Sequence, residues 1–315
     1  TSDEPTGPFK DALEKPLVAP MHDPTILTDD DKAKTPYIIY GDKEGGGFHV
    51  AEMNTDMISL AEEPQPITII GEEWKNAPIW MDKNYIFKYK DTYYLSWGRD
   101  YATSSNIYGP YTCKGAVGYG HHLNEFAHGS FFWWKGQFYH IWCYYIDRKF
   151  KFRESIISYC HIDESGKLVT DTRFLDKHFS YGVGRYHASW PKIEAEWYSS
   201  ASPGIEKKSA GKDNFVLSNI RNGDSIAFAN VTFENKPAEF IAAVKSVNGN
   251  GKIEIREESQ SGKLLGEIAF DSDSDAGKNQ IMSCQLEGIA GTKNIVLLFH
   301  GTPGSAIQLD YIQFR

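Results

Sequence analysis

The sequence predicts an all-β protein in which part of a β-propeller is followed by a β-sandwich. The propeller is indicated by three similar segments, KTPYIIYG at 34–41, DTYYLSWG at 91–98 and KGQFYHIW at 135–142. Aligned on Tyr37, Tyr94 and Tyr139, these segments recur 57 and 45 residues apart. Periods of about 40 to 60 residues built from short aromatic strands are typical of propeller blades.

A second repeat fixes the phase of the blades. The segment TSDEPTGPF at 1–9 returns as TSSNIYGPY at 103–111. We therefore expect residues 1–10 to form the closing part of one blade, on an outer strand, with three further blades at 23–66, 80–117 and 128–170. Propellers have about four to eight blades. The expectation is that N-terminal blades are absent from this sequence; the alternative is that its first blade is unusual.

The pattern changes after about residue 180. A Gly/Pro/aromatic connector, SYGVGRYHASWP at 180–191, precedes segments that alternate polar and apolar residues, at 225–233, 252–258, 294–301 and 306–314. Such alternation, broken by Asn/Gly/Asp turns, predicts a β-sandwich of the jelly-roll kind. We expect a partial propeller domain at 1–188 and a sandwich domain at 192–315. No segment has a convincing helical period.

Composition excludes several classes of function. Aromatic residues make up 14% of the chain, with 8 Trp and 18 Tyr, which suits both β-rich cores and stacking on sugars. The formal charge is −9 and no Lys/Arg cluster stands out, which argues against nucleic-acid binding. No run of about 18 apolar residues predicts a membrane span. The four cysteines lack metal-site spacing and are expected to be free thiols.

Several motifs, taken in order, resemble glycoside hydrolase family 43. They are GPFKDALEKPLV, HDPTILTDDD, MISL, DKNYIFKYKDTYYLSWG, YATS with YGPY and KG, HGSFFWWKGQFYHIW, and RESIISY. The resemblance implies the later blades of a five-bladed propeller. The segments KIEAEWY, NGDSIAF, KIEIR and IQLDYIQF resemble a family 6 carbohydrate-binding module. Together the two resemblances cover nearly the whole chain.

The family 43 resemblance implies an inverting glycosidase, in which one carboxyl protonates the leaving oxygen and another activates water. Asp23, in His-Asp-Pro-Thr, matches the aspartate that tunes the acid; an Asp before Pro is otherwise an ordinary turn residue. Counting back from Tyr93 places Asp82 at the acid position, where the family usually has Glu; Glu73 is a weaker candidate. Asn76-Ala77-Pro78 resembles the acid motif better, but an Asn cannot act as the acid. The resemblance implies that the general base lies on a first blade, and we expect that blade to be absent from this sequence.

Three further residues are implied to bind substrate. His128, in Ala-His-Gly-Ser, matches a histidine near the propeller axis that faces a bound ion or water cluster. Arg153, in Arg-Glu-Ser-Ile, matches an arginine that reaches the sugar in the −1 subsite, where its directed donors would hold sugar oxygens. Trp97 and the pair Trp133-Trp134 offer stacking faces, although one of two adjacent strand tryptophans is normally in the core.

The family 6 resemblance implies a structural calcium ion. Glu194 and Glu196 lie two residues apart on the expected first strand, so they would point the same way, and Asp310 lies on the last strand. Calcium prefers several hard oxygen ligands, which carboxylates supply. The sugar platform of the module is less complete, because Asn219 stands where an aromatic is expected and Gln308 where an Asn is expected. The module is therefore expected to be a weak binder or a structural buttress.

The leading expectation is an extracellular or periplasmic exo-acting glycosidase. Its substrate would be an arabinoxylan, arabinan or xylan, with α-L-arabinofuranose first and β-xylose second; an exo-β-galactanase-like activity is also compatible. The alternative from another class is a non-catalytic carbohydrate-binding protein with a degenerate propeller. A third interpretation is that the chain is the larger part of an enzyme whose N-terminal part belongs to the same propeller.

Overall fold

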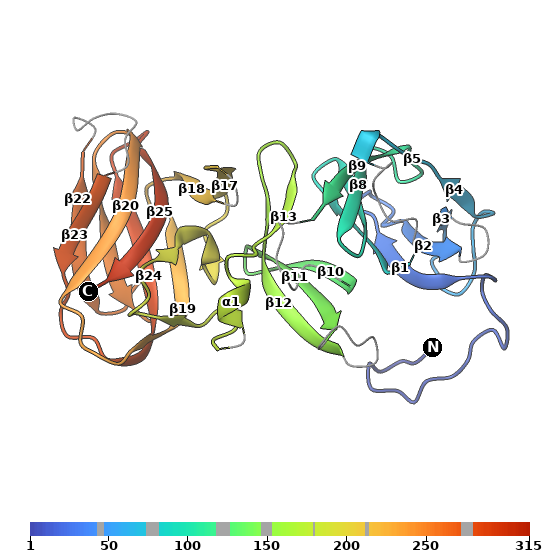
Figure 1. Ribbon diagram of the computed structural model, residues 1–315, viewed down its shortest axis with the longest axis horizontal. Coiled ribbons are helices and arrows are strands. Elements are labelled where there is room, and N and C mark those ends of the chain that lie inside the picture. Colours follow the sequence, from blue (N-terminus) through green and yellow to red (C-terminus); the bar gives the residue numbers. More distant parts are fainter. Residues whose placement is uncertain are drawn as a thin grey trace. The chain divides into compact units, whose positions relative to one another are not determined.

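The computed structural model describes residues 1–42, 47–73, 82–117, 127–145, 153–178, 180–211, 214–271 and 280–315 (Figure 1). Strands dominate, and among these residues the α-helix is α1 (Leu175–His178), with a 3-10 helix η3 (Ala195–Trp197). The all-β prediction is confirmed. In the described part of the chain, no helix has the length and apolar character needed to cross a membrane.

The chain divides into two compact units. The first comprises residues 1–131 and 141–156, and the second residues 132–140 and 157–315. The predicted boundary near residues 189–191 was drawn from a change in sequence pattern, and it stays a prediction. Each unit is described by itself below.

Two sheets of blade size lie in the first unit. One has the order β1 (His22–Thr28), β2 (Pro36–Asp42), β3 (Gly47–Glu52) and β4 (Gln65–Ile67), with antiparallel neighbours. The other has the order β5 (Ile69–Ile70), β9 (Tyr111–Ala116), β8 (Asp100–Ser104), β7 (Thr92–Trp97) and β6 (Asn84–Tyr89). Four-stranded antiparallel sheets are the unit from which propellers are built.

A third sheet of blade size has strands with residues in both units. Its order is β10 (Ala127–Trp134), β11 (Gln137–Tyr145), β12 (Arg153–Ile162) and β13 (Leu168–Thr170). The repeated tyrosines Tyr37, Tyr94 and Tyr139 lie on β2, β7 and β11, each of which pairs with the edge strand that precedes it in the chain, β1, β6 or β10. The sequence repeat therefore corresponds to a structural repeat.

Residues 1–10 differ from the expectation. No strand is present in residues 1–21, so the predicted outer strand does not form. The turn of the repeat is nevertheless kept: Gly7 donates its N–H to Glu4 O at 3.0 Å, and Gly109 donates its N–H to Asn106 O at 2.9 Å. Both glycines have a positive φ, 84° and 87°. After the second turn, Tyr111 continues into β9, which pairs with β5 and β8, whereas residues 8–10 meet no neighbouring strand.

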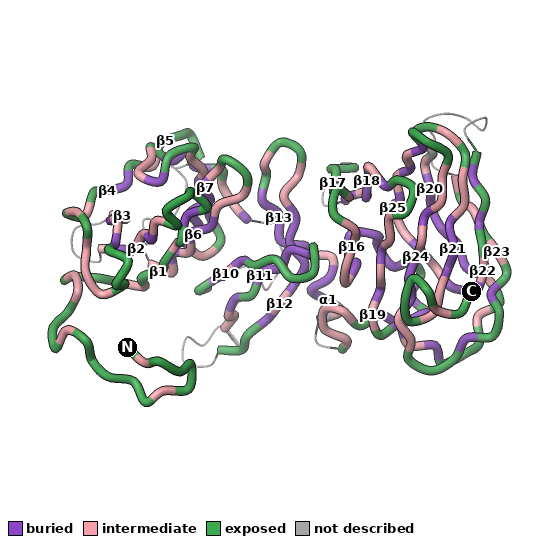
Figure 2. The backbone as a smooth tube through the Cα atoms, turned by 180° about the vertical axis from the view of Figure 1, so that it is seen from behind, coloured by how far each residue is buried: buried purple, intermediate pink, exposed green. Residues whose placement is uncertain are grey.

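The core of the first unit joins its two sheets. Ile39, Val50, Leu95 and Ala102, from β2, β3, β7 and β8, are fully buried members of one apolar cluster. Burying the Ile, Val and Leu side chains of this cluster stabilises the fold by about 2 kcal/mol each. Figure 2 marks the buried residues in purple along these strands.

A buried carboxylate also links the two sheets of the first unit. Asp29, one residue beyond β1, is 6% exposed; its Oδ1 accepts a hydrogen bond from Lys88 Nζ at 2.7 Å, and its Oδ2 accepts one from the Tyr93 hydroxyl. Burial alone would raise the pKa of Asp29. The hydrogen bonds from Lys88 and Tyr93 together outweigh that effect and lower this pKa to about 2.

The second unit contains a two-sheet sandwich, as predicted. One sheet has the order β14 (Tyr186–His187), β19 (Ser225–Phe233), β24 (Gly291–Gly301), β21 (Gly251–Glu257), β22 (Leu264–Phe270), with β16 (Ser200–Ala201) beside β19. The other has the order β17 (Glu206–Ser209), β18 (Phe215–Ile220), β25 (Ala306–Phe314), β20 (Glu239–Asn248), β23 (Gln280–Gln285), with β15 (Ile193–Glu194) beside β25. The expected strands at 225–233 and 306–314 are β19 and β25 themselves.

A buried polar cluster fixes the segment that precedes the sandwich. Asp171, just after β13, accepts a hydrogen bond from Trp197 Nε1 at 2.5 Å on its Oδ2, which lies 3.0 Å from His161 Nε2. Lys207 Nζ lies 3.1 Å from His161 Nδ1. An ammonium can only donate, so His161 accepts at Nδ1 and donates from Nε2 to Asp171. Burial, helped by Lys207, lowers the pKa of His161 to about 4, which keeps the ring neutral.

We predict that Asp29→Asn lowers the free energy of unfolding by about 2 kcal/mol at pH 7. The wild-type carboxyl has a lowered pKa in the fold, so its contribution is full above the unfolded-state pKa of about 4 and is lost as the pH falls towards 2. The wild type should therefore lose stability over this range faster than the variant does. Urea unfolding at several pH values measures the difference.

Asp30→Asn is the matched control. Asp30 also pairs with Lys88, but its side chain is 68% exposed, so its ion pair should contribute little. If Asp29→Asn and Asp30→Asn were equally stable at pH 7, Asp29 would not be the link between the sheets.

Candidate functional site

An open cavity of about 530 Å³ lies in the first unit, where three strands begin. Its walls come from β1, β6 and β10, each of which lies at an edge of its blade-sized sheet. The lining residues are Asp23, Pro24, Thr25, Ile26, Lys83, Asn84, Tyr85, His128, Gly129 and Ser130. Two of the predicted site residues, Asp23 and His128, are therefore brought to one cavity although 105 residues separate them in the sequence.

The backbone is unusual at the three points where the chain enters this cavity. Asp23, Lys83 and His128 have φ values of 46°, 61° and 51°, in the left-handed region. Residues other than glycine adopt this region at a cost of about 1 kcal/mol or more. Such conformations concentrate at functional sites, where the surrounding structure enforces them. Three of them around one cavity mark it as the candidate site.

Asp23 fixes the start of β6. Its Oδ2 accepts the backbone N–H of Lys83 at 2.7 Å, across 60 residues of sequence. Asn84, the next residue, is buried and donates from Nδ2 to Ile39 O at 3.1 Å. A short bond to a carboxylate is among the stronger hydrogen bonds in proteins. The position of Asp23 thus determines where the residues beside the predicted acid lie.

One residue of the cavity wall carries a buried acceptor without a partner in the described part of the chain. Asn84 Oδ1 is buried and has no hydrogen-bond partner among the described residues. Buried polar atoms nearly always have a partner, so an exception next to a cavity indicates a place for a polar ligand or water. Tyr85 supports the opposite wall, because its hydroxyl donates to Phe131 O at 3.0 Å. Burial raises the pKa of Tyr85, which keeps the hydroxyl protonated as a donor.

Asp82 lies beside the cavity rather than in its described wall. Its Oδ1 pairs with Lys83 Nζ at 3.0 Å, and both side chains are about a quarter exposed, 26% and 23%. Lys83, which lines the cavity, follows it directly in the chain. The acid assignment stays a prediction. Glu73 is exposed and lies close to Gly115, and Asn76 is outside the described residues.

Arg153 and Trp97 are not brought to the cavity wall. The Arg153 guanidinium lies over the Tyr145 ring, 5.0 Å from its centroid, and the residue is exposed. Trp97 is 4% exposed and packs against Phe48 in the core of the first unit, with ring centroids 5.8 Å apart. The face that was expected to stack on a sugar is therefore covered. Burial in the β-core explains this position, since Trp97 ends the inner strand β7.

Trp133 and Trp134 are both partly exposed, 41% and 63%. Trp133 stacks on Phe138 with ring centroids 3.9 Å apart. Neither is a fully buried core residue, in contrast to the expectation for one of two adjacent strand tryptophans.

All three predicted calcium ligands lie in the second unit, and two of them, Glu194 and Glu196, meet at one arginine. Glu194 ends β15, but Glu196 is in the 3-10 helix η3 rather than on the strand. The turn of η3 nevertheless presents both carboxylates to one guanidinium: Glu194 Oε1 lies 3.2 Å from Arg173 Nη1, and Glu196 Oε1 pairs with Nη2. Asp310 lies at a register shift of β25, two residues from the Ile312 that pairs with Ile193 of β15.

These three acidic residues have the donor chemistry of a calcium site. One oxygen of each, Glu194 Oε2, Glu196 Oε2 and Asp310 Oδ1, is buried without a hydrogen-bond partner among the described residues. Burial raises the pKa of Glu196 to about 8, against the opposing effect of Arg173. Among the same residues, no group of three His, Cys, Asp or Glu side chains is arranged to hold a metal ion. The carboxylate oxygens are of the type that calcium prefers, but Arg173 is already paired with one oxygen of each glutamate.

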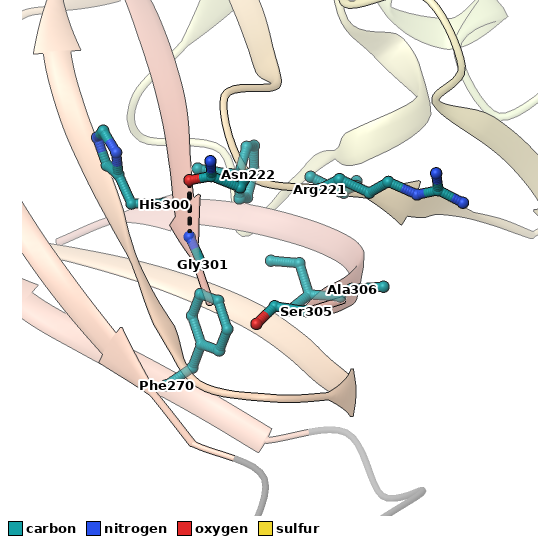
Figure 3. A pocket seen from close by; sticks show the side chains of 10 residues that line it. Arg221, Asn222, Phe270, His300, Gly301, Ser305 and Ala306 are labelled. Carbon is teal, nitrogen blue, oxygen red and sulfur yellow. Dashed lines mark hydrogen bonds between the residues drawn. The ribbon is translucent and has the colours of Figure 1, made fainter. Parts of the chain in front are cut away.

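A small pocket of the sandwich lies where the segments directly after Asn219 and directly before Gln308 meet (Figure 3). It is lined by Arg221, Asn222, Phe270, His300 and Ser305, among others, and Asn222 Oδ1 accepts the N–H of Gly301 at 3.1 Å. Its volume is about 10 Å³, the room needed for about one water molecule. A sugar ring does not fit into it.

Asn219 makes structural hydrogen bonds beside this pocket. Its Nδ2 donates to Gly204 O at 2.8 Å, and its Oδ1 accepts from Arg221 Nε at 2.9 Å. Its amide therefore holds the loop rather than replacing an aromatic face.

Sequence reasoning did not find Lys83, Asn84 or Arg173. Lys83 and Asn84 follow Asp82 at the start of β6, and this position in the sequence was a signal that went unused. Arg173, in the segment Asp171-Thr172-Arg173, carries no pattern that predicts its partners.

Comparisons with known proteins agree with the two resemblances. Residues 1–118 match the family model for glycosyl hydrolases family 43, and residues 194–315 match that for the carbohydrate binding module of family 6. The arabinoxylan arabinofuranohydrolase of Bacillus subtilis (strain 168) is 26% identical over 373 residues, covering 100% of this chain and 69% of that protein. The enzyme of the same name from Paenibacillus polymyxa is 25% identical over 368 residues, covering 100% and 55%.

One solved structure among those similar to this chain is also a family 43 protein. The arabinoxylan arabinofuranohydrolase of Bacillus subtilis in complex with cellotetraose matches with a TM-score of 0.43 and 23% identity, over 99% of this chain and 72% of that chain. The prediction of a family 43 region followed by a family 6 module is confirmed by the two family models. This chain spans 69% and 55% of the two curated relatives.

We predict that Lys83→Gly is more stable than Lys83→Ala by about 1 kcal/mol, because glycine adopts a positive φ without steric cost. Both variants lose the Lys83 side chain, so the difference between their free energies of unfolding reports the cost of the positive φ at this position. At Lys114, whose φ is not positive, the order should reverse. Urea unfolding of the four variants makes the comparison. Equal stability of the two Lys83 variants would contradict a left-handed backbone at this point of the cavity.

Proposed function

We propose that the Asp23–Lys83–His128 cavity binds a terminal sugar residue, and that the chain is the sugar-binding part of an exo-acting, inverting glycoside hydrolase. The observation that carries the proposal is the hydrogen bond from Lys83 N–H to Asp23, which joins two blade-sized sheets at a cavity with a left-handed backbone on three sides. Its volume of about 530 Å³ falls within the usual range for small-ligand sites.

The substrate class is a plant cell-wall polysaccharide of the arabinoxylan, arabinan or xylan type. Support comes from the family 43 match and from two relatives that are arabinoxylan arabinofuranohydrolases. The proposed leaving sugar is α-L-arabinofuranose, with β-xylose as the second choice and an exo-β-galactanase-like activity as a further alternative. Sugar hydroxyls suit the cavity, because the polar residues Lys83, Asn84 and His128 line it.

In the proposed mechanism, Asp82 donates a proton to the departing oxygen and Asp23 positions it. Asp23 acts through the backbone, since it accepts the N–H of the residue directly after Asp82. An error of about 1 Å in the position of a catalytic group can reduce the rate about a hundredfold, so this bond would matter to catalysis. A second carboxylate would have to activate water on the opposite face of the sugar.

A second candidate is a carbohydrate-binding protein without catalysis. It is favoured by two observations. The described lining of the cavity holds one carboxylate, Asp23, whereas inverting hydrolysis needs an acid and a base. Asp82 is also ion-paired with Lys83. In this case the same cavity would bind the sugar without cleaving it.

For the second unit we propose a calcium ion held by Glu194, Glu196 and Asp310. Bound calcium would neutralise buried carboxylates and so stabilise the first and last strands of the sandwich. The three buried oxygens without a partner support this assignment. An ion or water cluster beside His128 and a location outside the cytoplasm, extracellular or periplasmic, are parts of the same proposal.

We predict that Asp82→Asn lowers the rate of arabinose release from aryl α-L-arabinofuranosides with poor leaving groups by roughly 10²- to 10⁴-fold, the usual contribution of a general acid. Glycosides whose leaving group departs without a proton should be affected less. The rates are measured on the 315-residue chain and, if that is inactive, on any longer protein found to contain it.

Asp91→Asn, in the exposed turn before β7, is the control and should leave the rates unchanged. Equal loss with good and poor leaving groups would contradict the acid role of Asp82. Sugar binding without turnover in either protein would favour the non-catalytic candidate.

A further inference from the structure

Arg173 is the cation that faces the two buried glutamates of the sandwich. Its Nη1 lies 3.2 Å from Glu194 Oε1, and its Nη2 pairs with Glu196 Oε1. Two further acceptors hold the guanidinium: Asn214 Oδ1 at 2.7 Å and the Asp171 carboxylate at 3.6 Å. The side chain of Arg173 is 26% exposed, while those of Glu194 and Glu196 are 5% and 0% exposed.

The pairing is incomplete on both sides. The guanidinium takes one oxygen from each glutamate, which leaves Glu194 Oε2 and Glu196 Oε2 buried without a partner among the described residues. Arg173 Nε is also buried without a partner there. A planar guanidinium can bind one carboxylate through two parallel hydrogen bonds, but here it is divided between two. Buried charges that are only partly compensated are costly.

Other cations do not complete the compensation. Lys192 Nζ reaches Glu194 at 2.7 Å, but it binds the same Oε1 that Arg173 uses, and its side chain is 46% exposed. Lys207 is buried and feels the charge of Glu196, but its hydrogen-bond contacts are with Gln137 and His161, so it leaves Glu196 Oε2 without a partner among the described residues. Asp310 Oδ1 adds a third buried, unpartnered carboxylate oxygen. The site therefore has more acceptor capacity than its own cations satisfy.

Arg173 comes from the segment between β13 and α1, which precedes the sandwich strands in the chain. A divalent cation at Glu194 and Glu196 would face this guanidinium across shared carboxylates. Two positive charges near the same acceptors repel each other strongly where water is excluded. Because each glutamate has an oxygen engaged by Arg173, a divalent cation that used both oxygens would have to displace it.

We propose that Arg173 is a resident internal cation of this site and competes with calcium for Glu194 and Glu196. A residue outside the sandwich strands then lowers the calcium affinity of the site. Without Arg173, the two glutamates have lost this internal cation, and the stability of the protein comes to depend on bound calcium. This inference rests on the calcium site proposed above and adds to it the residue that opposes binding.

The test is calcium titration of the full 315-residue chain after treatment with a chelator. Calorimetry measures the affinity, and thermal unfolding with CaCl₂ or with chelator measures the stability. Arg173→Gln is expected to bind calcium at least tenfold more tightly than the wild type. It should also melt lower than the wild type in chelator and recover in calcium at about 1 mM, the range in which extracellular modules bind it.

Arg185→Gln, which removes an exposed arginine of the same unit, is the control and should behave as the wild type. Arg173→Lys keeps the charge but loses the planar fork, so it should bind calcium with intermediate affinity. If Arg173→Gln does not fold even with calcium, the calcium affinity of Arg173→Lys is compared with that of the wild type. Tighter binding by Arg173→Lys would then support the competition, and equal binding would overturn it. Adding Asp310→Asn to Arg173→Gln should weaken binding again.

Equal calcium affinity of the wild type and the Arg173 variants would overturn the competition while leaving the calcium site in place. Failure of both the wild type and the variants to bind millimolar calcium would overturn the calcium site and the competition together. Weaker binding in Arg173→Gln than in the wild type would show that Arg173 supports calcium rather than opposing it.

Discussion

The candidate site depends on one hydrogen bond, from the backbone N–H of Lys83 to the carboxylate of Asp23. Asp23 is the second residue of β1 and Lys83 directly precedes β6, and both have a left-handed backbone. Neither conformation is favourable for its residue, so the surrounding sheets must hold them in place. The apolar cluster of β2, β3, β7 and β8 and the buried Asp29 supply that rigidity. A binding site on rigid strand ends is more precise than one on free loops.

The second unit handles buried charge in a different way. Asp171 is fully satisfied by Trp197, His161 and the backbone, so its charge locks the segment before the sandwich. Glu194 and Glu196 are satisfied on one oxygen each. A satisfied buried network rigidifies a structure, whereas a partly satisfied one leaves room for a further ligand. Asp171, whose oxygens all have partners, therefore belongs to a structural cluster, whereas the two glutamates, each with one oxygen lacking a partner in the described part of the chain, could bind a cation.

The sequence predicted elements whose signals are local and repeated. The period of Tyr37, Tyr94 and Tyr139 located three blade-sized sheets, and alternation located β19 and β25. Asp23 and His128 were predicted by motif and lie in one cavity. The strand expected at residues 1–10 did not form, because a strand needs a neighbour that local sequence does not show. Trp97 faces the core, and Arg173 meets the glutamates through tertiary packing, which no spacing in a single sequence encodes.

The central claim is that the Asp23–Lys83–His128 cavity is the place where this chain binds sugar. Amide chemical-shift mapping by NMR, with arabinose-substituted xylo-oligosaccharides titrated into the isotope-labelled chain, tests it directly. The account predicts that the largest shifts fall on Lys83, Asn84 and Gly129, at the starts of β6 and β10. Shifts confined to the sandwich loops around residues 221–222 and 301–305, with none at the cavity, would contradict it.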